Sequence, residues 1–242
     1  MAEPRVAVVT GGSRGIGAEI TRQLAGRGLR VACTYRSGKD EANALAAELA
    51  TDVLTVHFEL GDAESAESLV ATVLERFGRL DTLVLNAGVW HGGRLEDLDP
   101  SLWWRVLESN VGGAAQVARA ALPALRRGSA PSVTLVSSAV GIIGFPGDTA
   151  YGSAKAAMTG FARSLAKEVG RDGIRVNVLA PGFVETDMTA AIPERSRERI
   201  IADMVLRRLG TAAEVARAAV FLAEDATYCT GTILTVDGGW SL

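Results

Sequence analysis

The stretch that decides the fold is Thr10–Gly17, which reads Thr10-Gly11-Gly12-Ser13-Arg14-Gly15-Ile16-Gly17. It follows the apolar run Arg5–Thr10, which is typical of a buried strand. It leads into a segment where Ile16, Ile20 and Leu24 recur every four residues, as on one face of a helix. Glycines let a backbone turn sharply and approach a pyrophosphate, and free N–H groups at a helix N-terminus attract its charge. A plain tight turn would also contain glycines, but the position between strand and helix favours a nucleotide-binding turn.

Six further apolar, β-branched runs follow, and helix-length segments separate them. Most of these runs are continuously apolar, which is typical of strands buried on both faces of a parallel sheet. Repeated strand–helix–strand units imply right-handed crossovers. The sequence therefore predicts an α/β fold, a Rossmann-like doubly wound sheet of about seven parallel strands with helices on both faces. The predicted strands are Arg5–Thr10, Leu29–Tyr35, Asp52–Phe58, Thr82–Leu85, Ser132–Ser137, Ile174–Leu179 and Thr232–Val236.

Composition excludes several classes of protein. Of 242 residues, 48% are hydrophobic, which is typical of a folded globular chain, and 25 basic against 28 acidic residues leave no electrostatic footprint for nucleic acid or an anionic membrane. No apolar run could span a bilayer and no signal-peptide core begins the chain, so we expect a cytoplasmic protein. Cys33 and Cys229 lie in apolar contexts and are expected to be reduced core thiols. His57 and His91 are too scattered for a metal site.

We expect residues 1–242 to form a single domain, with a cofactor-binding half at about 1–100 and a catalytic and substrate-binding half at about 101–242. The sequence contains no linker, repeat or low-complexity tract. Its least regular stretch is the polar segment Gly182–Arg208. A long segment of this kind is more often a lid over a functional site than a domain boundary.

The end of the second predicted strand indicates which cofactor binds. An NAD site usually carries Asp or Glu there for the ribose 2′-hydroxyl. This chain has Tyr35, Arg36 and Ser37, and it has Arg14 in the glycine turn. Guanidinium groups pair bidentately with phosphate oxygens, so these residues favour the 2′-phosphate of NADP(H). The alternative is that both arginines are solvated surface residues.

A tyrosine and a lysine four residues apart begin a helical segment further along the chain. This spacing places Tyr151 and Lys155 on one helix face. Ser138 follows a buried strand, at the end of the sheet where doubly wound folds bind ligands. Asn110 lies inside the predicted helix Leu102–Leu125, where asparagine is a poor helix former. These four residues are candidates for acid–base chemistry.

Taken together, the motifs resemble those of the short-chain dehydrogenase/reductase family, in its small single-domain branch, over nearly the whole chain. The glycine turn is similar to the family's TGxxxGxG, and the four candidates fall where the family has its catalytic tetrad. Within the family, the chain looks most like 3-oxoacyl-[acyl-carrier-protein] reductases. The other matching motifs are Asn86-Ala87-Gly88, Pro181-Gly182 through Thr186, and the Val-Asp-Gly-Gly ending.

The resemblance implies a catalytic role for each of the four candidates. Tyr151 would protonate a carbonyl oxygen as hydride arrives at its carbon, and Ser138 would hold that oxygen. Lys155 would lower the pKa of the tyrosine and hold the nicotinamide ribose, and Asn110 would keep a water that links the lysine to solvent. Metal ligands are not expected. The expected cofactor-binding residues are Gly11, Ser13, Arg14, Gly15, Ile16, Gly17, Tyr35, Arg36, Ser37, Glu59, Leu60, Asn86, Ala87, Gly88, Tyr151, Lys155, Pro181, Gly182, Val184 and Thr186.

Two stretches depart from the pattern of those reductases. Glu59 stands where the family usually has Asp at the adenine edge, and Val89–Gly93 replaces a common Ile-Thr-Arg-Asp sequence. Trp90 and His91 in that loop could line the mouth of the substrate site, and for His91 a surface loop without a chemical role is equally consistent. Asp62 is either a family-like cofactor residue or an ordinary helix N-cap.

A third departure concerns protein partners. The reductases dock an acidic carrier protein through arginines beside the active-site entrance. The aligned positions here are Ser129 and Asp172, although Arg126, Arg127 and Arg171 are close in sequence. A shifted arginine either reaches the same acidic groups or does not, so docking of a carrier protein stays open.

Three hypotheses of function follow. The first is an NADPH-dependent reductase of 3-oxoacyl thioesters, presented on acyl carrier protein or coenzyme A. The second is a family reductase or dehydrogenase of a free ketone or alcohol, such as a sugar, a steroid-like ring or another small molecule. The third is a binding protein that senses NADP(H) without catalysis, against which the intact tetrad argues.

The family resemblance also implies a homotetramer. Its interfaces would use the segments Leu102–Leu125, Tyr151–Val169 and Ala212–Gly239, which are rich in alanine and glycine and would let backbones pack closely. The alternative is that these small residues serve only the packing of helices on the sheet.

Overall fold

The computed structural model describes residues 3–190 and 192–242. Seven strands form one parallel sheet in the order β3-β2-β1-β4-β5-β6-β9, so the predicted α/β class and all seven strand predictions are confirmed. Ala7 in the central strand pairs with Val31 on one side and Thr82 on the other. The strands of the sheet are β1 (Val6–Val9), β2 (Arg30–Tyr35), β3 (Val53–His57), β4 (Thr82–Leu85), β5 (Ser132–Val136), β6 (Arg175–Pro181) and β9 (Ile233–Val236).

The strand order reverses at β1, because the chain runs outwards through β2 and β3 and then returns to pair β4 with β1. In doubly wound sheets a crevice opens at this point, outside the carboxyl ends of the strands. The glycine turn follows β1 and therefore lies at that crevice.

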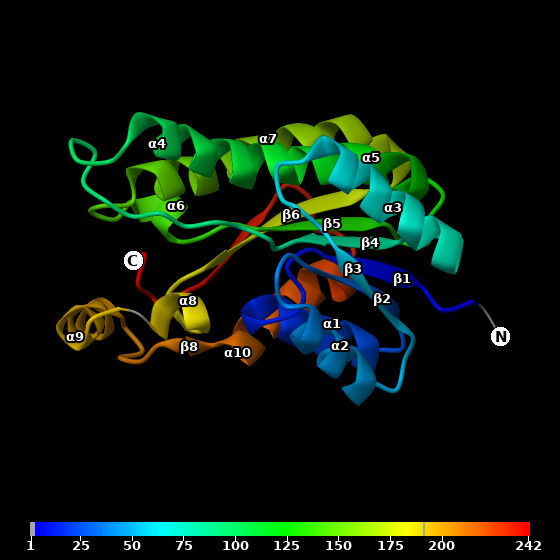
Figure 1. The fold of residues 1–242 in the computed structure, drawn as a ribbon, viewed down its shortest axis with the longest axis horizontal. Helices are drawn as coiled ribbons and strands as arrows, with labels where there is room; N and C mark the ends of the chain where they lie inside the picture. The colour runs from blue at the N-terminus through cyan, green and yellow to red at the C-terminus, as the bar shows by residue number, and fades with distance from the viewer. Residues whose placement is uncertain (1–2, 191) are drawn as a thin grey trace.

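Helices cover both faces of the sheet, as the sequence predicts. One apolar cluster packs α3, α5 and α7 against one face, and a second packs α1 and α10 against the other, an arrangement visible in Figure 1. The helical elements are α1 (Gly15–Gly26), α2 (Lys39–Glu48), α3 (Ala63–Phe77), α4 (Pro100–Leu107), the π-helical turn η1 (Glu108–Gly112), α5 (Gly113–Leu125), α6 (Val140–Ile143), α7 (Thr149–Val169), η2 (Gly170–Asp172), α8 (Asp187–Ala190), α9 (Glu194–Asp203), α10 (Ala212–Val220) and η3 (Phe221–Asp225).

Local sequence explains where several of these helices begin and pack. Ile20 and Leu24 of α1 are fully buried, as their four-residue spacing predicts. The carboxylate of Asp62 accepts the N–H groups of Glu64 and Ser65, so Asp62 is the N-cap of α3. Gly28, just after α1, has a positive φ of 83°, which only glycine adopts without strain.

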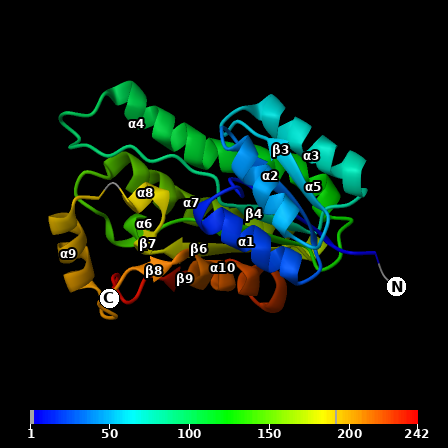
Figure 2. The same cartoon turned by 60° about the horizontal axis from the view of Figure 1, so that its bottom comes forward.

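The segment expected to be least regular, Gly182–Arg208, is more ordered than the sequence suggests in the part that the structure describes, residues 182–190 and 192–208. It contains α8, α9 and the short strand β7 (Val184–Glu185), which pairs with β8 (Gly210–Thr211). Ile200 and Met204 of this segment pack with Trp240 near the C-terminus, beside α6. Figure 2 shows α9 and the C-terminal segment side by side at one end of the molecule. A few apolar side chains therefore anchor the segment, although most of its sequence is polar.

Candidate active site

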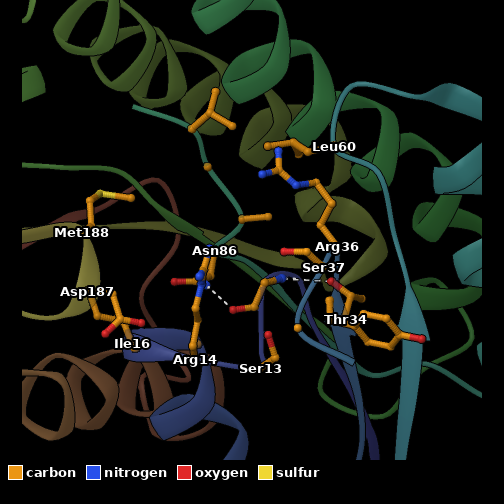
Figure 3. A pocket seen from close by; sticks show the side chains of 18 of the residues that line it. Ser13, Arg14, Ile16, Thr34, Arg36, Ser37, Leu60, Asn86, Asp187 and Met188 are labelled. Atoms are coloured by element: carbon orange, nitrogen blue, oxygen red, sulfur yellow. Dashed lines mark hydrogen bonds between the residues drawn. The ribbon is translucent and has the colours of Figure 1, made fainter. Parts of the chain in front are cut away.

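A cleft of about 490 Å³ lies at the crevice predicted from the strand order. Its walls come from the glycine turn, the ends of β2 and β3, the loop after β4, and the segment that begins at β7. In Figure 3 the side chain of Arg36 extends towards Leu60, whereas Asp187 and Met188 lie on the other side of Asn86. The lining residues are Gly11, Ser13–Gly17, Thr34–Gly38, Phe58, Leu60, Asn86–Trp90 and Thr186–Met188.

The glycine turn makes room for a ligand by its backbone conformation. Gly11 and Gly15 have positive φ angles of 62° and 54°. A Cβ on Gly17 would overlap the carbonyl oxygen of Gly11, so only glycine allows the helix to start this close to the turn. No side chain caps the N-terminus of α1 at Arg14. The free N–H groups of this first turn therefore suit a phosphate.

Two strand ends hold the turn in place. The N–H of Gly11 donates to Oγ1 of Thr34 at 2.9 Å. The side-chain amide of Asn86 donates to the carbonyl oxygens of Thr10 and Gly11 at 3.0 and 3.1 Å. Asn86, one of the expected cofactor-binding residues, thus ties the end of β4 to the turn.

The residues expected to select the cofactor are all exposed to the cleft. Arg14, Tyr35, Arg36 and Ser37 all line it. Within the described residues, neither arginine forms an ion pair with a carboxylate. Both guanidinium groups are therefore available for an anionic ligand. Glu59 is exposed and does not line the cleft, although its neighbour Leu60 does.

The four candidate catalytic residues come from three parts of the chain. Ser138 follows β5, Tyr151 and Lys155 lie on α7, and Asn110 lies in η1. The contact that joins them to the cleft is Gly88. A Cβ built on this glycine would lie 2.8 Å from Oδ1 of Asn110 and 3.3 Å from Nζ of Lys155. Since Gly88 lines the cleft, the lysine and the asparagine lie immediately behind its wall.

Asn110 is held by a departure from ideal helix geometry. The predicted helix Leu102–Leu125 is interrupted by the π-helical turn η1, which contains this residue. Its Nδ2 donates to the carbonyl oxygens of Val106 at 2.8 Å and Val89 at 2.9 Å. Its Oδ1 is buried and finds no partner among the described residues. A buried acceptor of this kind is suited to a bound water.

Burial dominates the electrostatics of the tyrosine–lysine pair. Lys155 is 3% exposed, and desolvation lowers its pKa to about 8. The pKa of Tyr151 is raised to about 12: burial is the largest cause, the charge of Asp148 adds to it, and the hydrogen bond with the Ser138 hydroxyl opposes it. The Nζ of Lys155 lies 5.5 Å from the centre of the Tyr151 ring, so the two groups are close enough to interact.

The motif Pro181-Gly182 through Thr186 has a structural role in most of its positions. A Cβ on Gly182 would lie 2.7 Å from Cβ of Asp237, so glycine there permits close approach of the C-terminal segment. Val184 is buried, and Pro181 accepts the N–H of Ala139. The structure places these three residues outside the lining of the cleft, and brings Thr186 into it beside Gly15.

Several lining residues were not predicted from the sequence, among them Thr34, Phe58, Asp187 and Met188. Thr34 and Phe58 lie at the carboxyl ends of parallel strands, so aligning the predicted strand ends could have found them. Asp187 and Met188 belong to α8, and their position depends on how the segment after β7 folds back over the turn. No sequence signal carries that information.

Trp90 lines the cleft at the loop after β4. Its indole N–H donates to Oδ1 of Asp148 at 2.8 Å, and its side chain remains 48% exposed. The sequence indicates that Trp90 could line the mouth of the substrate site, but it does not indicate that the indole binds Asp148.

The described residues contain no cluster of side chains that could hold a metal ion. Nor does any helix in the described parts of the chain have the length and apolar character needed to cross a bilayer. Cys33 is fully buried and Cys229 is half-buried, and both thiols are free.

Comparison with known proteins agrees with this geometry. The family model described as "Enoyl-(Acyl carrier protein) reductase" matches residues 11–241. The 3-oxoacyl-[acyl-carrier-protein] reductase FabG of Escherichia coli (strain K12) is 39% identical over 238 residues, which cover 98% of this chain and 97% of that protein. FabG of Staphylococcus aureus (strain Mu50) is 35% identical and covers 96% of each chain.

Among solved structures, a short-chain dehydrogenase/reductase of Serratia marcescens, solved as a double mutant, superposes with a TM-score of 0.93. It is 32% identical and covers 99% of both chains. The sequence match, the sheet order and the solved relative agree, and the chain belongs to the short-chain dehydrogenase/reductase family of oxidoreductases.

Proposed function

We propose that the chain is an NADPH-dependent carbonyl reductase whose substrate is a 3-oxoacyl thioester, reduced to the 3-hydroxyacyl thioester. The observation that carries the proposal is the placement of Lys155 and Asn110 behind Gly88, at the end of a cleft built for a dinucleotide. The similarity to 3-oxoacyl-[acyl-carrier-protein] reductases over almost the whole chain supports this substrate class.

The cleft suits NADP(H) in its donors and its charge. The free N–H groups at the start of α1 would receive the pyrophosphate, and the two arginines without ion pairs, Arg14 and Arg36, would receive the 2′-phosphate. When bound, the cofactor supplies hydride to the carbonyl carbon. The family uses nicotinamide cofactors, and these arginines favour the phosphorylated form.

The side chains behind Gly88 would supply and replace the proton. Tyr151 would donate its phenolic proton to the carbonyl oxygen, which the Ser138 hydroxyl would hold. The ammonium of Lys155 would stabilise the phenolate left behind. The unpartnered Oδ1 of Asn110 would hold a water that returns a proton towards the lysine.

One observation bears on the carrier of the acyl group. Nε of Arg126 donates to Asp172 at 2.7 Å, and Arg127 donates to the carbonyl oxygen of Pro123. With Asp172 neutralising Arg126, this edge offers less free positive charge to an acidic carrier protein. Within the proposed thioester class, this pairing favours a coenzyme A thioester over a carrier-protein thioester, and a free ketone or alcohol is the second candidate substrate.

A steady-state panel tests the proposal. NADPH and NADH are each offered with acetoacetyl thioesters of coenzyme A and of acyl carrier protein, with free ketones, and with a 2-enoyl thioester, the class named in the family model's description. We expect oxidation of NADPH with the 3-oxoacyl thioesters. Turnover of free ketones alone would show that the second candidate, a free ketone or alcohol, is the substrate. Turnover of the enoyl thioester alone would overturn the proposed carbonyl reduction.

We further propose that the chain acts as one domain and assembles as a homotetramer through α5, α7 and α10. The small residues Gly112 of η1, Ala115 of α5, and Ala156 and Ala157 of α7 are half-buried or exposed, so they are available for close helix packing. Light scattering tests this proposal, and a mass of one subunit would refute it.

A further inference from the structure

Asp148 lies one helical turn before Tyr151. Its carbonyl accepts the N–H of Gly152 at 2.7 Å, so the chain is already helical between the two residues. Residues three apart on a helix are neighbours on its surface. The side chain of Asp148 is thus a neighbour of the Tyr151 side chain, whose phenol the proposed reaction uses, and its charge acts on that phenol.

An indole from another part of the chain holds this carboxylate. Trp90, in the loop after β4, donates its Nε1–H to Oδ1 of Asp148 at 2.8 Å. The ring passes close to the backbone of its own loop, because a Cβ on Gly92 would lie 2.6 Å from Cζ2 of the indole. Glycine at position 92 leaves room for the indole to reach Asp148.

Two more contacts fasten the same segment. The N–H of Gly93 donates to the carbonyl oxygen of Gly147 at 2.8 Å. Nε1 of Trp103, on α4, donates to Oγ1 of Thr149 at 3.2 Å. The residues on both sides of Asp148 are therefore held by the loop after β4 and by α4, and its carboxylate has a defined position.

The charged groups that face Tyr151 are Asp148, before it on the chain, and Lys155, after it on the same helix. Ser138, from the segment after β5, contributes a neutral hydroxyl. The Tyr151 side chain also packs against an apolar cluster that includes Val140 of α6, Ile200 of α9 and Trp240 near the C-terminus. In such surroundings a single negative charge has a large effect on a phenolate.

We propose that Asp148, clamped by Trp90, is a positioning residue that keeps the Tyr151 phenol protonated. Tyr151 then remains a proton donor for carbonyl reduction over a wider pH range and is a poorer base for oxidation of the alcohol. The proposal rests on the proposed reductase function and specifies the direction in which the site works best. Burial and the Asp148 charge both raise the pKa of Tyr151, which agrees with this role.

A spectroscopic titration tests the proposal without relying on turnover. Tyrosinate absorbance is followed against pH for the unaltered chain and for Asp148→Asn, and each curve is corrected with the same protein carrying Tyr151→Phe. A carboxyl group is ionised throughout the alkaline range in which tyrosine titrates. We expect Asp148→Asn to lower the midpoint of Tyr151 by about one pH unit.

Matched variants separate charge from packing. Asp148→Glu keeps the charge, and Trp90→Phe removes the indole donor but leaves the carboxylate. We expect both to shift the midpoint by less than half of the Asp148→Asn effect. Asp148→Gln is a second uncharged variant if Asp148→Asn fails to fold. An unchanged or raised midpoint in the folded uncharged variants would overturn the proposal.

Kinetics provide a second readout. In Asp148→Asn, the alkaline fall of the reduction rate should move down by about one pH unit, and oxidation of the alcohol near neutral pH should rise by up to about tenfold. An unaltered chain that reduces no carbonyl compound would overturn the proposed function. The tyrosinate titration would still decide the role of Asp148, so the two failures are distinguishable.

Discussion

The ammonium of Lys155 donates a hydrogen bond of 2.9 Å to the backbone carbonyl oxygen of Val136, the last residue of β5. The adjacent Ser137 returns the contact, because its hydroxyl donates to the carbonyl oxygen of Lys155 at 2.7 Å. Strand β5 and helix α7 thus hold each other at the position where the strand leads into Ser138. The lysine is oriented by backbone groups and, among the residues that the structure describes, is buried without a carboxylate partner.

Burial of the charged Lys155 side chain destabilises the folded chain. The pKa of Lys155 falls from 10.5 to about 8, so between these pH values the unfolded chain binds more protons than the folded one, and the free energy of unfolding rises with pH. The gain is at most about 3 kcal/mol. Relative to Lys155→Met, the unaltered chain should therefore become more stable from about pH 8 to 10.5, as measured by urea denaturation. Lys167 lies on the same helix and is exposed, so the difference in stability between the unaltered chain and Lys167→Met should not change over this pH range. The same pH-dependent difference for both variants would contradict the account.

Gly88 lies between the cleft and two of the proposed catalytic side chains, Asn110 and Lys155, and a methyl group there should disturb them. Because its Cβ would lie 2.8 Å from Oδ1 of Asn110, Gly88→Ala must displace Asn110 or Lys155. We expect kcat to fall by about tenfold or more, since misplacement by a few tenths of an ångström already weakens oriented catalysis. Gly170→Ala, where a Cβ meets no atom within 4 Å, is the matched control. Equal kcat values for the two variants would show that Gly88 has no such role.

Gly17 should be essential for the nucleotide-binding turn. A Cβ there overlaps the carbonyl oxygen of Gly11 and approaches Nδ2 of Asn86, so Gly17→Ala should open the turn. We expect a loss of about 1–3 kcal/mol in unfolding free energy and a large loss of NADPH affinity, measured by denaturation and by fluorescence titration. Gly26→Ala, on the same helix with free space around it, should leave the affinity for NADPH intact. Normal binding by Gly17→Ala would refute the pyrophosphate assignment.

The two arginines that line the cleft should determine the preference for NADPH. Each charge-assisted contact to a phosphate contributes about 1.5–3 kcal/mol, so Arg36→Ala should weaken NADPH binding about tenfold to a hundredfold and affect NADH little. Arg22→Ala, on α1 but outside the cleft lining, is the control. The ratio of kcat/KM for the two cofactors measures the effect. An unchanged ratio in Arg36→Ala would assign the preference to other residues.

The sequence alone was sufficient to predict the strands of the sheet and the position of the cleft. The seven apolar runs became the seven strands, because strands buried on both faces must be continuously apolar. The glycine turn, the two arginines and Gly88 line one cleft because parallel strands bring their carboxyl ends to the same edge. These features depend on short-range patterns and on the rule for sheet topology.

The remaining features depend on contacts between distant parts of the chain. The Trp90–Asp148 hydrogen bond joins residues 58 positions apart, and neither has a spacing that indicates the other. The side-chain amide of Asn110, in the π-helical turn, donates to the carbonyl oxygen of Val89, which lies 21 positions earlier. The order of the segment Gly182–Arg208 comes from packing against Trp240. Local helix and strand propensities give no information about these long-range contacts.

The most direct test of the central claim is the rate of NADPH oxidation with an acetoacetyl thioester, compared between the unaltered chain and Tyr151→Phe. This substitution removes only the phenolic hydroxyl and keeps the ring packed against α6 and Trp240. We expect thioester-dependent oxidation of NADPH by the unaltered chain and a loss of at least about a hundredfold in the variant. Oxidation retained by Tyr151→Phe would contradict the assignment of Tyr151 as the proton donor.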